Sequence, residues 1–210
     1  GYIVDDGTIK FCENKLRKHI LNTKDVSLIG KHNYQNICAA IAATSTLVDE
    51  ETARKTVSQF KGVHHRLELV KEDSNKVKWY NDSASSSPTR TISGIKAFYK
   101  KVILIAGGYD KNLDYTPIAK PIVDGTKALI LMGATKTKIY NSVARELNAQ
   151  GKELDIYEVF SLDEAIDVAK SISKTGDIVL FSPASASFDM FKNAYDRGDK
   201  FKEAVNRKIN

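Results

Sequence analysis

Short apolar runs separated by longer amphipathic stretches are the feature that most constrains how this chain folds. Five such runs follow Val63: Val77–Tyr80, Val102–Ala106, Ala128–Met132, Ile156–Val159 and Asp177–Phe181. Unbroken apolar runs of this length are typical of strands buried on both faces of a parallel sheet. Because helical patterns separate the runs and strand crossovers are right-handed, the sequence predicts an α/β fold with a doubly wound, mainly parallel sheet.

Four helices are expected among these strands: from Ser87 to about Tyr99, over residues 137–148, directly after Ser161, and from Phe188 to about Arg207. Proline supports the start of the first helix, since Pro88 has no N–H to leave unpaired in the first turn. Ser161 and Glu164 have the spacing of a capping box. These signals indicate where two of the helices begin.

The first 62 residues have a different character. The segment YIVDDGTIKF predicts a hairpin that turns at Asp6-Gly7. Helices are predicted over residues 33–48 and from Asp49, as N-cap, to Phe60. A hairpin and two helices bury little apolar surface. We therefore expect residues 1–62 to be the tail of a larger domain and residues 63–210 to be a domain of their own.

Composition restricts the class of partner. The chain carries a formal net charge of +6, and its lysines are scattered, which favours small anionic ligands such as nucleotides over nucleic acid. Cys12 and Cys38 lack CxxC spacing, no apolar run approaches the ~20 residues of a membrane span, and no signal-like segment opens the chain. We expect a soluble, cytoplasmic protein with reduced cysteines and no membrane contact, and we expect it to be a monomer.

Polar loops follow four of the predicted strands. They are Asn81–Ser87, Gly107–Tyr115, Gly133–Lys136 and Ser182–Asp189, and each is rich in Gly, Ser, Asp or Lys. In an open parallel sheet, ligands bind beyond the carboxyl ends of the strands, where such loops meet. The sequence therefore predicts that the four loops converge on one rim and that the serine run WYNDSASSSPTRT is a rim loop rather than a linker.

Each of these features also has a purely structural interpretation. Gly107-Gly108 closes a tight turn, and without GxGxxG spacing it has no predicted dinucleotide role. Lys111 is equally well interpreted as a solvated lysine, and Asp82 as a cap of the following helix. Ser185 and Ser187 either cap the terminal helix or form a carboxylate or phosphate site with its free N–H groups. GxxxxGK[ST] and helical zinc spacing are both missing from the sequence, so neither a P-loop nor a metal site is predicted.

Four motifs, in order, resemble those of the Mur ligases. GKHNYQNICAA resembles the family's HNxxNxxAA helix, GVHHRLE its domain-junction HRxE segment, YNDS its nucleotide-contacting loop, and SPASASFDMFKNAYDRGDKF its final serine-rich loop and helix. The likeness covers nearly the whole chain from about Gly30. NDS and GGYDK resemble the members that add D-glutamate. The tyrosine-alanine-histidine-proline pattern usual in other members and in folylpolyglutamate synthase is missing.

The resemblance implies a three-domain enzyme, of which this chain is the end of a central ATPase domain plus a Rossmann-like C-terminal domain for the incoming amino acid. The implied activity requires ATP and Mg²⁺. The carboxylate of UDP-N-acetylmuramoyl-L-alanine is phosphorylated, and the amine of D-glutamate attacks the acyl phosphate to form the amide of a peptidoglycan precursor. The family's P-loop, magnesium ligands and modified lysine are expected in a preceding segment. We therefore expect no catalytic or metal-binding residue in this chain, and no activity from it alone.

Carried over position by position, the resemblance implies two groups of binding residues. The ATP group is Asn36 at the adenine with Asn33 supporting it, Arg66 at the phosphates and Asp82 at the ribose hydroxyls. The D-glutamate group is Lys111 and Ser187 at the carboxylates, with Phe188 beside them and Ser86 in place of a usual threonine. The chemistry is consistent, since a fixed cation plus neutral donors suits a dicarboxylate, and an aspartate accepts from both hydroxyls of a diol.

Two other interpretations stay open. In one, the chain is part of another Mur-type ligase that adds a different amino acid. In the other, it is a nucleotide- or amino-acid-binding module without catalysis. Ala84 and Ala194 stand where many relatives have lysine and phenylalanine, so the amino-acid pocket departs in detail from the family pattern.

Overall fold

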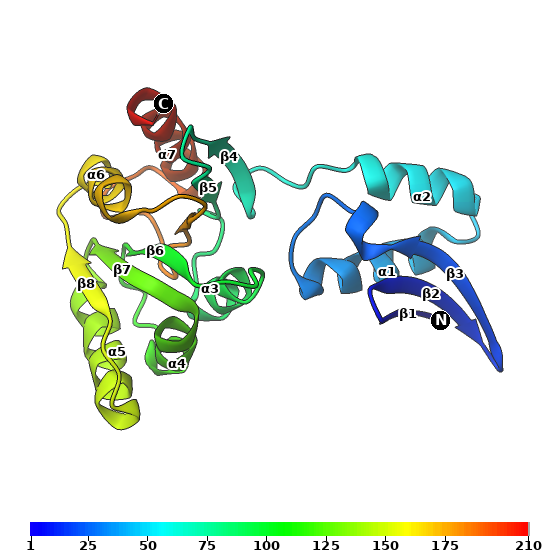
Figure 1. Ribbon diagram of the computed structural model, residues 1–210, viewed down its shortest axis with the longest axis horizontal. Helices are drawn as coiled ribbons and strands as arrows, with labels where there is room; N and C mark the ends of the chain where they lie inside the picture. Colours follow the sequence, from blue (N-terminus) through cyan, green and yellow to red (C-terminus); the bar gives the residue numbers. More distant parts are fainter. Residues whose placement is uncertain (210) are drawn as a thin grey trace. The chain divides into compact units, whose positions relative to one another are not determined.

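The computed structural model describes residues 1–209, and the chain divides into two compact units, Gly1–Gly62 and Val63–Asn210. The first unit holds a three-stranded antiparallel sheet, a short 3-10 helix and two α-helices (Figure 1). Their bounds are β1 (Tyr2–Asp5), β2 (Thr8–Glu13), β3 (Leu16–Asn22), η1 (Thr23–Asp25), α1 (Lys31–Thr44) and α2 (Glu50–Gln59). That this unit is the tail of an ATPase domain stays a prediction.

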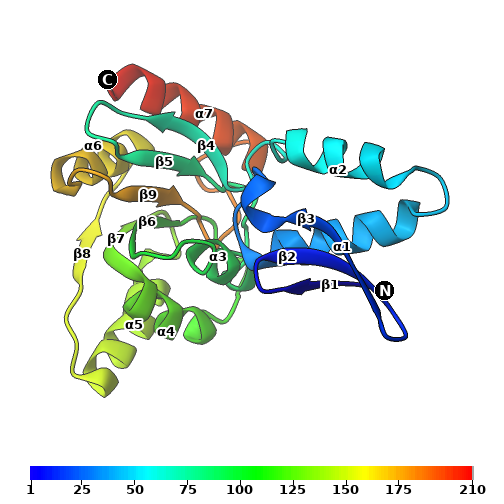
Figure 2. The ribbon, with the colours of Figure 1, turned by 45° about the vertical axis from the view of Figure 1, so that its right-hand side comes forward.

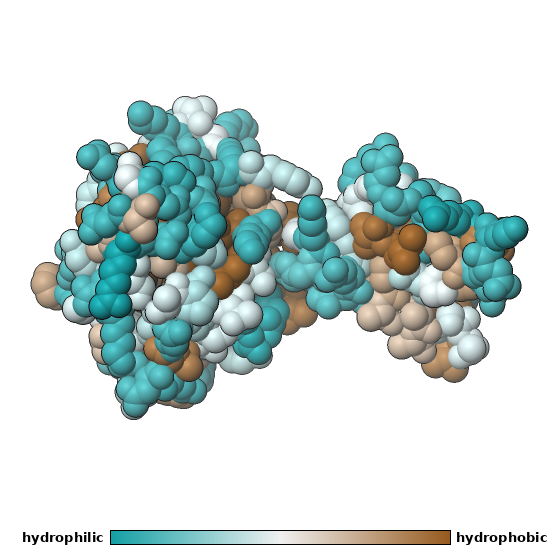
Figure 3. Space-filling view, turned by 90° about the horizontal axis from the view of Figure 1, so that it is seen from below, coloured by the Kyte–Doolittle hydropathy of each residue, from teal (hydrophilic) through white to brown (hydrophobic). Residues whose placement is uncertain are grey.

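The core of the first unit is small. It consists of the buried side chains Ile9, Ile20, Leu21, Val26, Ile37, Cys38 and Ile41. Several large apolar side chains of the same unit reach solvent instead, among them Leu47 at 80% exposure and Leu16 at 59%. In Figure 3, where brown marks hydrophobic residues, separate brown patches lie among hydrophilic side chains at the surface.

The hairpin predicted at Asp6-Gly7 is confirmed. Asp5 pairs with Thr8, and both turn residues have positive φ, 43° at Asp6 and 66° at Gly7, as a two-residue hairpin turn requires. The strand β3 is additional, because the exposed and charged start of LRKHILN hides its strand pattern. The first predicted helix ends at Thr44 rather than residue 48, and the N-cap of α2 is confirmed by Asp49, whose carboxylate accepts the Thr52 N–H at 2.7 Å.

The second unit is built on a six-stranded sheet in the order β4-β5-β9-β6-β7-β8 (Figure 2). The strands are β4 (Glu68–Glu72), β5 (Lys78–Asn81), β6 (Val102–Gly107), β7 (Thr126–Met132), β8 (Asp155–Glu158) and β9 (Ile178–Phe181). The five strands β5 to β9 pair in parallel, and β4 pairs antiparallel to β5 at the edge. The mainly parallel sheet is thus confirmed. The additional edge strand ELVKE carries charges and has no unbroken apolar run.

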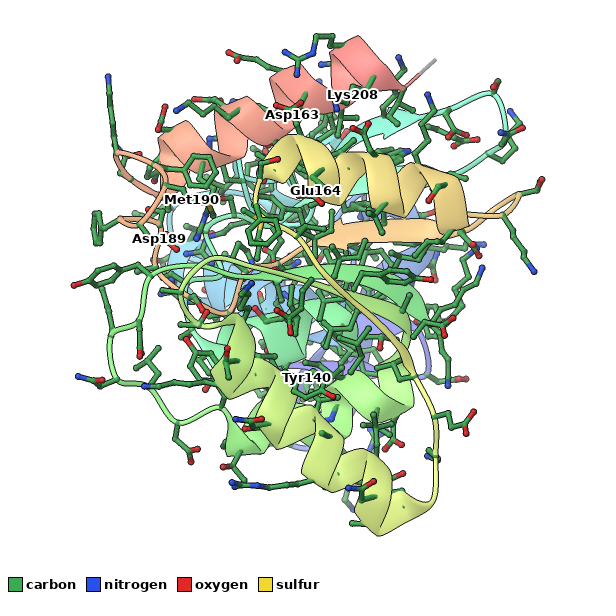
Figure 4. The ribbon with its side chains drawn as sticks, turned by 90° about the vertical axis from the view of Figure 1, so that its left-hand side faces the viewer. Tyr140, Asp163, Glu164, Asp189, Met190 and Lys208 are labelled. Carbon is green, nitrogen blue, oxygen red and sulfur yellow. The ribbon has the colours of Figure 1, made fainter. Side chains whose placement is uncertain are left out.

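Helices cover both faces of this sheet. They are α3 (Pro88–Ile95), α4 (Thr116–Gly125), α5 (Lys136–Gln150), α6 (Leu162–Ile172) and α7 (Ala194–Lys208). Figure 4 shows α6 and α7 on one side of the sheet and α5 on the other. On the α6–α7 side, Ile103 and Ile105 of β6 pack with Phe201 and Val205 of α7 in one buried cluster. The doubly wound arrangement is confirmed.

Two predicted helix boundaries of the second unit are wrong, and one helix was missed. The helix α3 ends at Ile95 instead of Tyr99, and α7 begins at Ala194 instead of Phe188. Asn193 sets the later start of α7, because its side chain accepts the N–H groups of Tyr195 and Asp196, both at 2.9 Å. The helix α4 was not predicted, since its two prolines resemble a loop. Within residues 1–209, every helix is too short or too polar to cross a membrane.

Candidate functional site

The strand β9 lies between β5 and β6, so the loop that follows it meets the loops after both neighbours. Backbone hydrogen bonds join them directly. The Asp82 N–H donates to the Phe181 carbonyl at 2.8 Å, the Gly107 N–H to Pro183 at 2.8 Å, and the Tyr109 N–H to Ala186 at 2.9 Å. The predicted convergence of these loops at the carboxyl edge is therefore confirmed.

The loop after β7 joins the same rim. Its Thr135 N–H donates to the Gly108 carbonyl at 3.0 Å, and its Ala134 N–H donates to the Asp189 carboxylate at 3.1 Å. Asp189 and Met190 are labelled in Figure 4 in the loop that follows β9. All four polar loops therefore meet at one edge of the sheet.

Gly107-Gly108 allows this close approach. Their φ values are +112° and +153°, and a Cβ at either position would overlap a backbone carbonyl oxygen, that of Met132 or that of Ala186. Glycine tolerates both constraints because it has no Cβ. The interpretation of the pair as a tight turn agrees with this geometry.

Asp82 has a buried carboxylate, 3% exposed, at the end of β5. One oxygen accepts the Ser182 hydroxyl at 2.6 Å and the other accepts the Leu67 N–H at 3.2 Å. Burial raises the pKa of Asp82, while these hydrogen bonds and the nearby Arg66 charge act in the opposite direction. Asp82 does not cap α3, since Ser87 occupies the N-cap, and the Ser87 side chain makes no capping bond either. The Ser85 side chain is a further hydrogen-bond partner of the Asp82 carboxylate, whose two oxygens together still have acceptor capacity for another donor.

Arg66 and Ser86 border the same part of the rim. Arg66 is exposed, and its positive charge partly opposes the rise in the Asp82 pKa that burial causes. Ser86 is half-buried and its N–H donates to the Ala84 carbonyl at 3.0 Å. Within residues 1–209 the Arg66 guanidinium has no hydrogen-bond or ion-pair partner, so it can turn toward an anion beside Asp82.

Lys111 and Phe188 are neighbours. The Lys111 ammonium lies 5.4 Å from the centroid of the Phe188 ring, and the Tyr109 ring meets that ring edge-on at 6.0 Å. A cation over an aromatic face is stabilised by the ring's quadrupole. Within residues 1–209, Lys111 has no carboxylate partner. Its positive charge therefore remains available to a ligand.

Ser187 precedes Phe188 and is only 2% exposed. Its carbonyl accepts the N–H groups of Met190 and Phe191 at 3.2 and 2.9 Å, which forms a turn well before α7. The structural interpretation in which Ser185 and Ser187 cap the terminal helix is therefore excluded, because Asn193 caps α7. The α-helix N-terminus that was expected beside Ser187 lies at Asn193 instead.

Arg197 is a site residue that sequence reasoning missed. It is 1% exposed, and its guanidinium donates to the carbonyls of Ser83, Ser185 and Ala186 at 2.8 to 3.0 Å and to the Ser83 hydroxyl at 3.0 Å. Burial lowers the Arg197 pKa to about 10. Arg197 thereby ties the loops after β5 and β9 to α7. The segment YDRGDKF gives no signal of this, because its charged pattern is that of an exposed helix.

His65 and Asn81 form a second buried pair that the sequence did not indicate. The Asn81 amide nitrogen donates to His65 Nδ1 at 2.9 Å and to the Gly198 carbonyl at 3.2 Å. Burial lowers the pKa of His65, so the imidazole is neutral at neutral pH. A Cβ at Gly198 would overlap the imidazole ring. The pair therefore anchors the start of the second unit against α7.

Asn33 and Asn36 lie on α1 in the first unit. The Asn33 amide nitrogen donates to the Ile29 carbonyl at 2.7 Å, and Asn36 donates to the Asn33 side-chain oxygen at 3.5 Å. Asn33 therefore orients Asn36, which is exposed. Among residues 1–209, no group of three or more His, Cys, Asp or Glu side chains is arranged to hold a metal ion. Cys12 and Cys38 are both free thiols.

Cavity volume alone does not identify this site. A cleft of about 580 Å³ lies between α3 and α4, at the amino ends of the strands and thus opposite the rim. Its lining includes Phe98, Pro117 and Pro121. The rim is defined instead by convergent loops, a buried carboxylate and an ammonium that has no carboxylate partner among residues 1–209.

Comparison with known proteins gives a family and a set of relatives. The model described as "Mur ligase, glutamate ligase domain" matches residues 65–185. The chain is 45% identical over 208 residues to the UDP-N-acetylmuramoylalanine--D-glutamate ligase of Acetivibrio thermocellus, covering 98% of this chain and 44% of the relative. It is 50% identical over 190 residues to the protein of that name from Clostridium botulinum Alaska E43, covering 90% and 41%. The chain thus spans less than half the length of these relatives.

Solved structures share the fold at low sequence identity. Folylpolyglutamate synthase of Mycobacterium tuberculosis complexed with ADP matches with a TM-score of 0.64 at 13% identity, covering 96% of this chain and 46% of that one. The murein peptide ligase Mpl of Psychrobacter arcticus matches with a TM-score of 0.55 at 18% identity, covering 99% and 44%. The resemblance seen in the four sequence motifs is thereby confirmed, and the chain belongs to the Mur ligase family.

Proposed function

We propose that this chain is the C-terminal part of an ATP-dependent ligase that adds D-glutamate to UDP-N-acetylmuramoyl-L-alanine. The observation that carries the proposal is the 45% and 50% identity, over 98% and 90% of the chain, to proteins named as that ligase. The convergence of four polar loops on one rim supports it, because such an edge is where open α/β sheets bind ligands.

The amino-acid substrate would be held at the Lys111 side of the rim. A dicarboxylate requires a cation, and the Lys111 ammonium lacks a carboxylate partner within residues 1–209. Ser187 and Ser86 would supply neutral hydroxyl donors, and the Phe188 ring would hold the lysine over the site. Charge-assisted hydrogen bonds of this kind are the strong ones, and they fix orientation as well as affinity.

The nucleotide would be held by a second set of residues. The Asp82 carboxylate has acceptor capacity left for a ribose hydroxyl, and Arg66 carries an exposed charge for phosphates. Asn36, oriented by Asn33, would contact the adenine. When bound, ATP supplies the phosphoryl group that activates the acceptor carboxylate, and Mg²⁺ neutralises charge on the phosphates.

The contribution of this chain to the rate is chiefly positioning. The amine of D-glutamate forms a C–N bond with the activated carbonyl carbon, the amine loses a proton, and inorganic phosphate leaves. Holding the amine in line with that carbon turns an encounter between two molecules into a step within one complex. The Lys111, Ser187 and Ser86 side chains would determine this orientation by holding the two carboxylates of D-glutamate.

The test is amino-acid incorporation by the full-length enzyme. We expect labelled D-glutamate to enter UDP-N-acetylmuramoyl-L-alanine in an ATP-dependent manner, and incorporation of a different amino acid instead would refute the substrate assignment. Lys111→Ala should raise the KM for D-glutamate at least tenfold, since a charged hydrogen bond contributes about 1.5–3 kcal/mol, and should leave the KM for ATP nearly unchanged. Lys101→Ala, at an exposed lysine before β6, is the matched control.

Asp82→Ala provides the complementary test. Its loss should appear mainly as a higher KM for ATP, because the carboxylate is assigned to the ribose rather than to D-glutamate. Unchanged nucleotide binding by this variant would remove Asp82 from the ATP site. An unchanged D-glutamate KM in Lys111→Ala would likewise remove Lys111 from the amino-acid site.

A further inference from the structure

Three buried hydroxyl groups link the rim loops to one another. The Ser185 hydroxyl lies 2.8 Å from the Tyr115 hydroxyl and 2.8 Å from the Thr135 hydroxyl. The Thr135 hydroxyl also accepts the Gly108 N–H at 3.0 Å. Ser185 and Thr135 are fully buried and Tyr115 is 3% exposed. The loops after β6, β7 and β9 are thus joined by one chain of hydrogen bonds in which Ser185 is central.

Lys111 lies between two points at which the loop after β6 is hydrogen-bonded to the loop after β9. On its amino side, the Tyr109 N–H donates to Ala186 at 2.9 Å, and on its carboxyl side the Tyr115 hydroxyl meets Ser185. Both attachments are made to the loop that carries Ser187 two residues beyond Ser185. The Tyr115–Ser185 bond and the Tyr109 bond together therefore hold the segment from Tyr109 to Tyr115 against the loop after β9. The same two hydrogen bonds thus hold the backbone segments that carry Lys111 and Ser187.

The position of the Lys111 ammonium depends on a backbone that is held in place. Lys111 is exposed, and among residues 1–209 its side chain makes no hydrogen bond or ion pair, while its Nζ lies 5.4 Å from the centroid of the Phe188 ring. A lysine stem is flexible, so the position of its ammonium depends strongly on where the backbone is held. Removing the Tyr115–Ser185 bond would leave the fold in place, since the Gly107 and Tyr109 N–H groups still donate to the loop after β9. It would loosen the spacing between the two ligand-binding side chains.

We propose that Tyr115 is a positioning residue: its hydroxyl, bound to Ser185, sets the spacing between Lys111 and Ser187 and thereby the affinity for the dicarboxylate amino acid. This inference rests on the function proposed above, since it assumes that Lys111 and Ser187 hold that substrate. Neither Tyr115 nor Ser185 touches the substrate in this assignment. Tyr115 acts through the loop that it fastens.

The experiment compares Tyr115→Phe with Tyr140→Phe in the full-length enzyme. Both variants delete one hydroxyl from the same unit, and the Tyr140 hydroxyl has no hydrogen-bond partner among residues 1–209. Tyr140 is labelled on α5 in Figure 4. We expect Tyr115→Phe to raise the KM for D-glutamate about fivefold, the ratio that corresponds to about 1 kcal/mol, with the KM for ATP unchanged. Tyr140→Phe should change neither constant.

Combining Tyr115→Phe with a change at Lys111 distinguishes a positioning role from a purely structural one. In a Lys111→Gln background, Tyr115→Phe should have little further effect on the D-glutamate KM, because the group that it positions is gone. Ser185→Ala should reproduce the effect of Tyr115→Phe, and the double variant should be no worse than either one. Equal effects of Tyr115→Phe with and without Lys111, or a fall in thermal stability without a change in KM, would overturn the inference.

The outcomes separate this inference from the proposed function. If the wild-type enzyme incorporates another amino acid, the substrate assignment fails, and the Tyr115→Phe effect is measured on the KM of that amino acid by the same criterion. If D-glutamate is incorporated but Tyr115→Phe behaves like Tyr140→Phe, the proposed function stands and the positioning role is refuted.

Discussion

Asp82 combines a buried carboxylate with two internal hydrogen bonds, and burial is the larger influence on its pKa, which is raised. A carboxyl group whose pKa is higher in the folded chain binds more protons when folded, so lowering the pH favours folding. This gain begins as the pH falls toward the raised pKa and is complete below the ordinary value of 3.8. The carboxylate therefore destabilises the fold at neutral pH relative to its protonated form.

The corresponding prediction concerns Asp82→Asn in this 210-residue chain. As the pH is lowered from 7 toward 4, the free energy of unfolding of the wild-type chain should rise relative to that of the variant. Denaturant titrations at a series of pH values measure the difference. Asp124→Asn is the control, because hydrogen bonds from Lys120 and Lys152 lower the Asp124 pKa to about 2. Its difference from wild type should stay constant down to about pH 5, and a constant difference for Asp82→Asn as well would contradict the prediction.

At the scale of single residues, position after a strand was the informative signal. Lys111, Asp82 and Ser187 were predicted to share one rim because each follows a strand of a parallel sheet, and the loops that carry them do converge. Arg197 and His65 were missed because their role depends on burial by elements distant in the sequence. Nothing in the letters around Arg197 distinguishes a buried arginine from one on the surface of a helix. The ligand roles of all these residues remain predictions.

Helix starts give a matched comparison at the scale of elements. Asn193 caps α7 with two hydrogen bonds, whereas Ser87 occupies the N-cap of α3 without a side-chain bond. Replacing a capping side chain by alanine removes a partner of the exposed N–H groups and costs ~1 kcal/mol, up to about 2. Comparing alanine variants at the two positions therefore tests whether the capping hydrogen bonds, rather than the N-cap position as such, stabilise the helix.

We expect Asn193→Ala to lower the free energy of unfolding by about 1–2 kcal/mol, because two N–H groups lose their acceptor. Ser87→Ala should change it by less than about 0.5 kcal/mol, since no capping bond is lost. Urea denaturation of the two variants measures both values. Equal losses would show that the hydrogen bonds seen at Asn193 do not stabilise α7.

Sequence patterns predicted most of these elements and missed those where competing signals were present. The fully apolar β6 and β7 were predicted because both faces of each strand are buried. The edge strand β4 and the exposed start of β3 were not, since charged residues interrupt any apolar pattern there. In α4, Pro117 and Pro121 outweighed a helical apolar face that tertiary packing then buries. The order of strands was beyond local patterns altogether.

At the scale of the whole molecule, the two units differ in the size of their buried clusters. The first unit buries Cys38 among a few aliphatic side chains, and the second buries Trp79, the chain's only tryptophan, in a much larger cluster. Because stability grows with the apolar area buried, the first unit should be the weaker of the two. Cys38 can therefore report the unfolding of the first unit, and Trp79 that of the second.

We expect the Cys38 thiol of a Cys12→Ser variant to become reactive at a lower urea concentration than that at which Trp79 fluorescence changes. Burial protects Cys38 and raises its pKa in the folded chain, so labelling reports the opening of the first unit. Pulsed thiol labelling and fluorescence on the same samples give the two midpoints. Coincident midpoints would mean that the chain unfolds as one cooperative unit.

The position of β9 has a consequence for biosynthesis. Of the six strands in this sheet it comes last along the chain, yet it pairs with both β5 and β6. Until it emerges, the nascent chain can assemble only β4 with β5 and, separately, β6 with β7 and β8, so two strand edges stay open to other chains. Completion of the sheet is thus postponed until β9 has been synthesised, and a message truncated before Ile178 would yield two partial sheets without the strand that joins them.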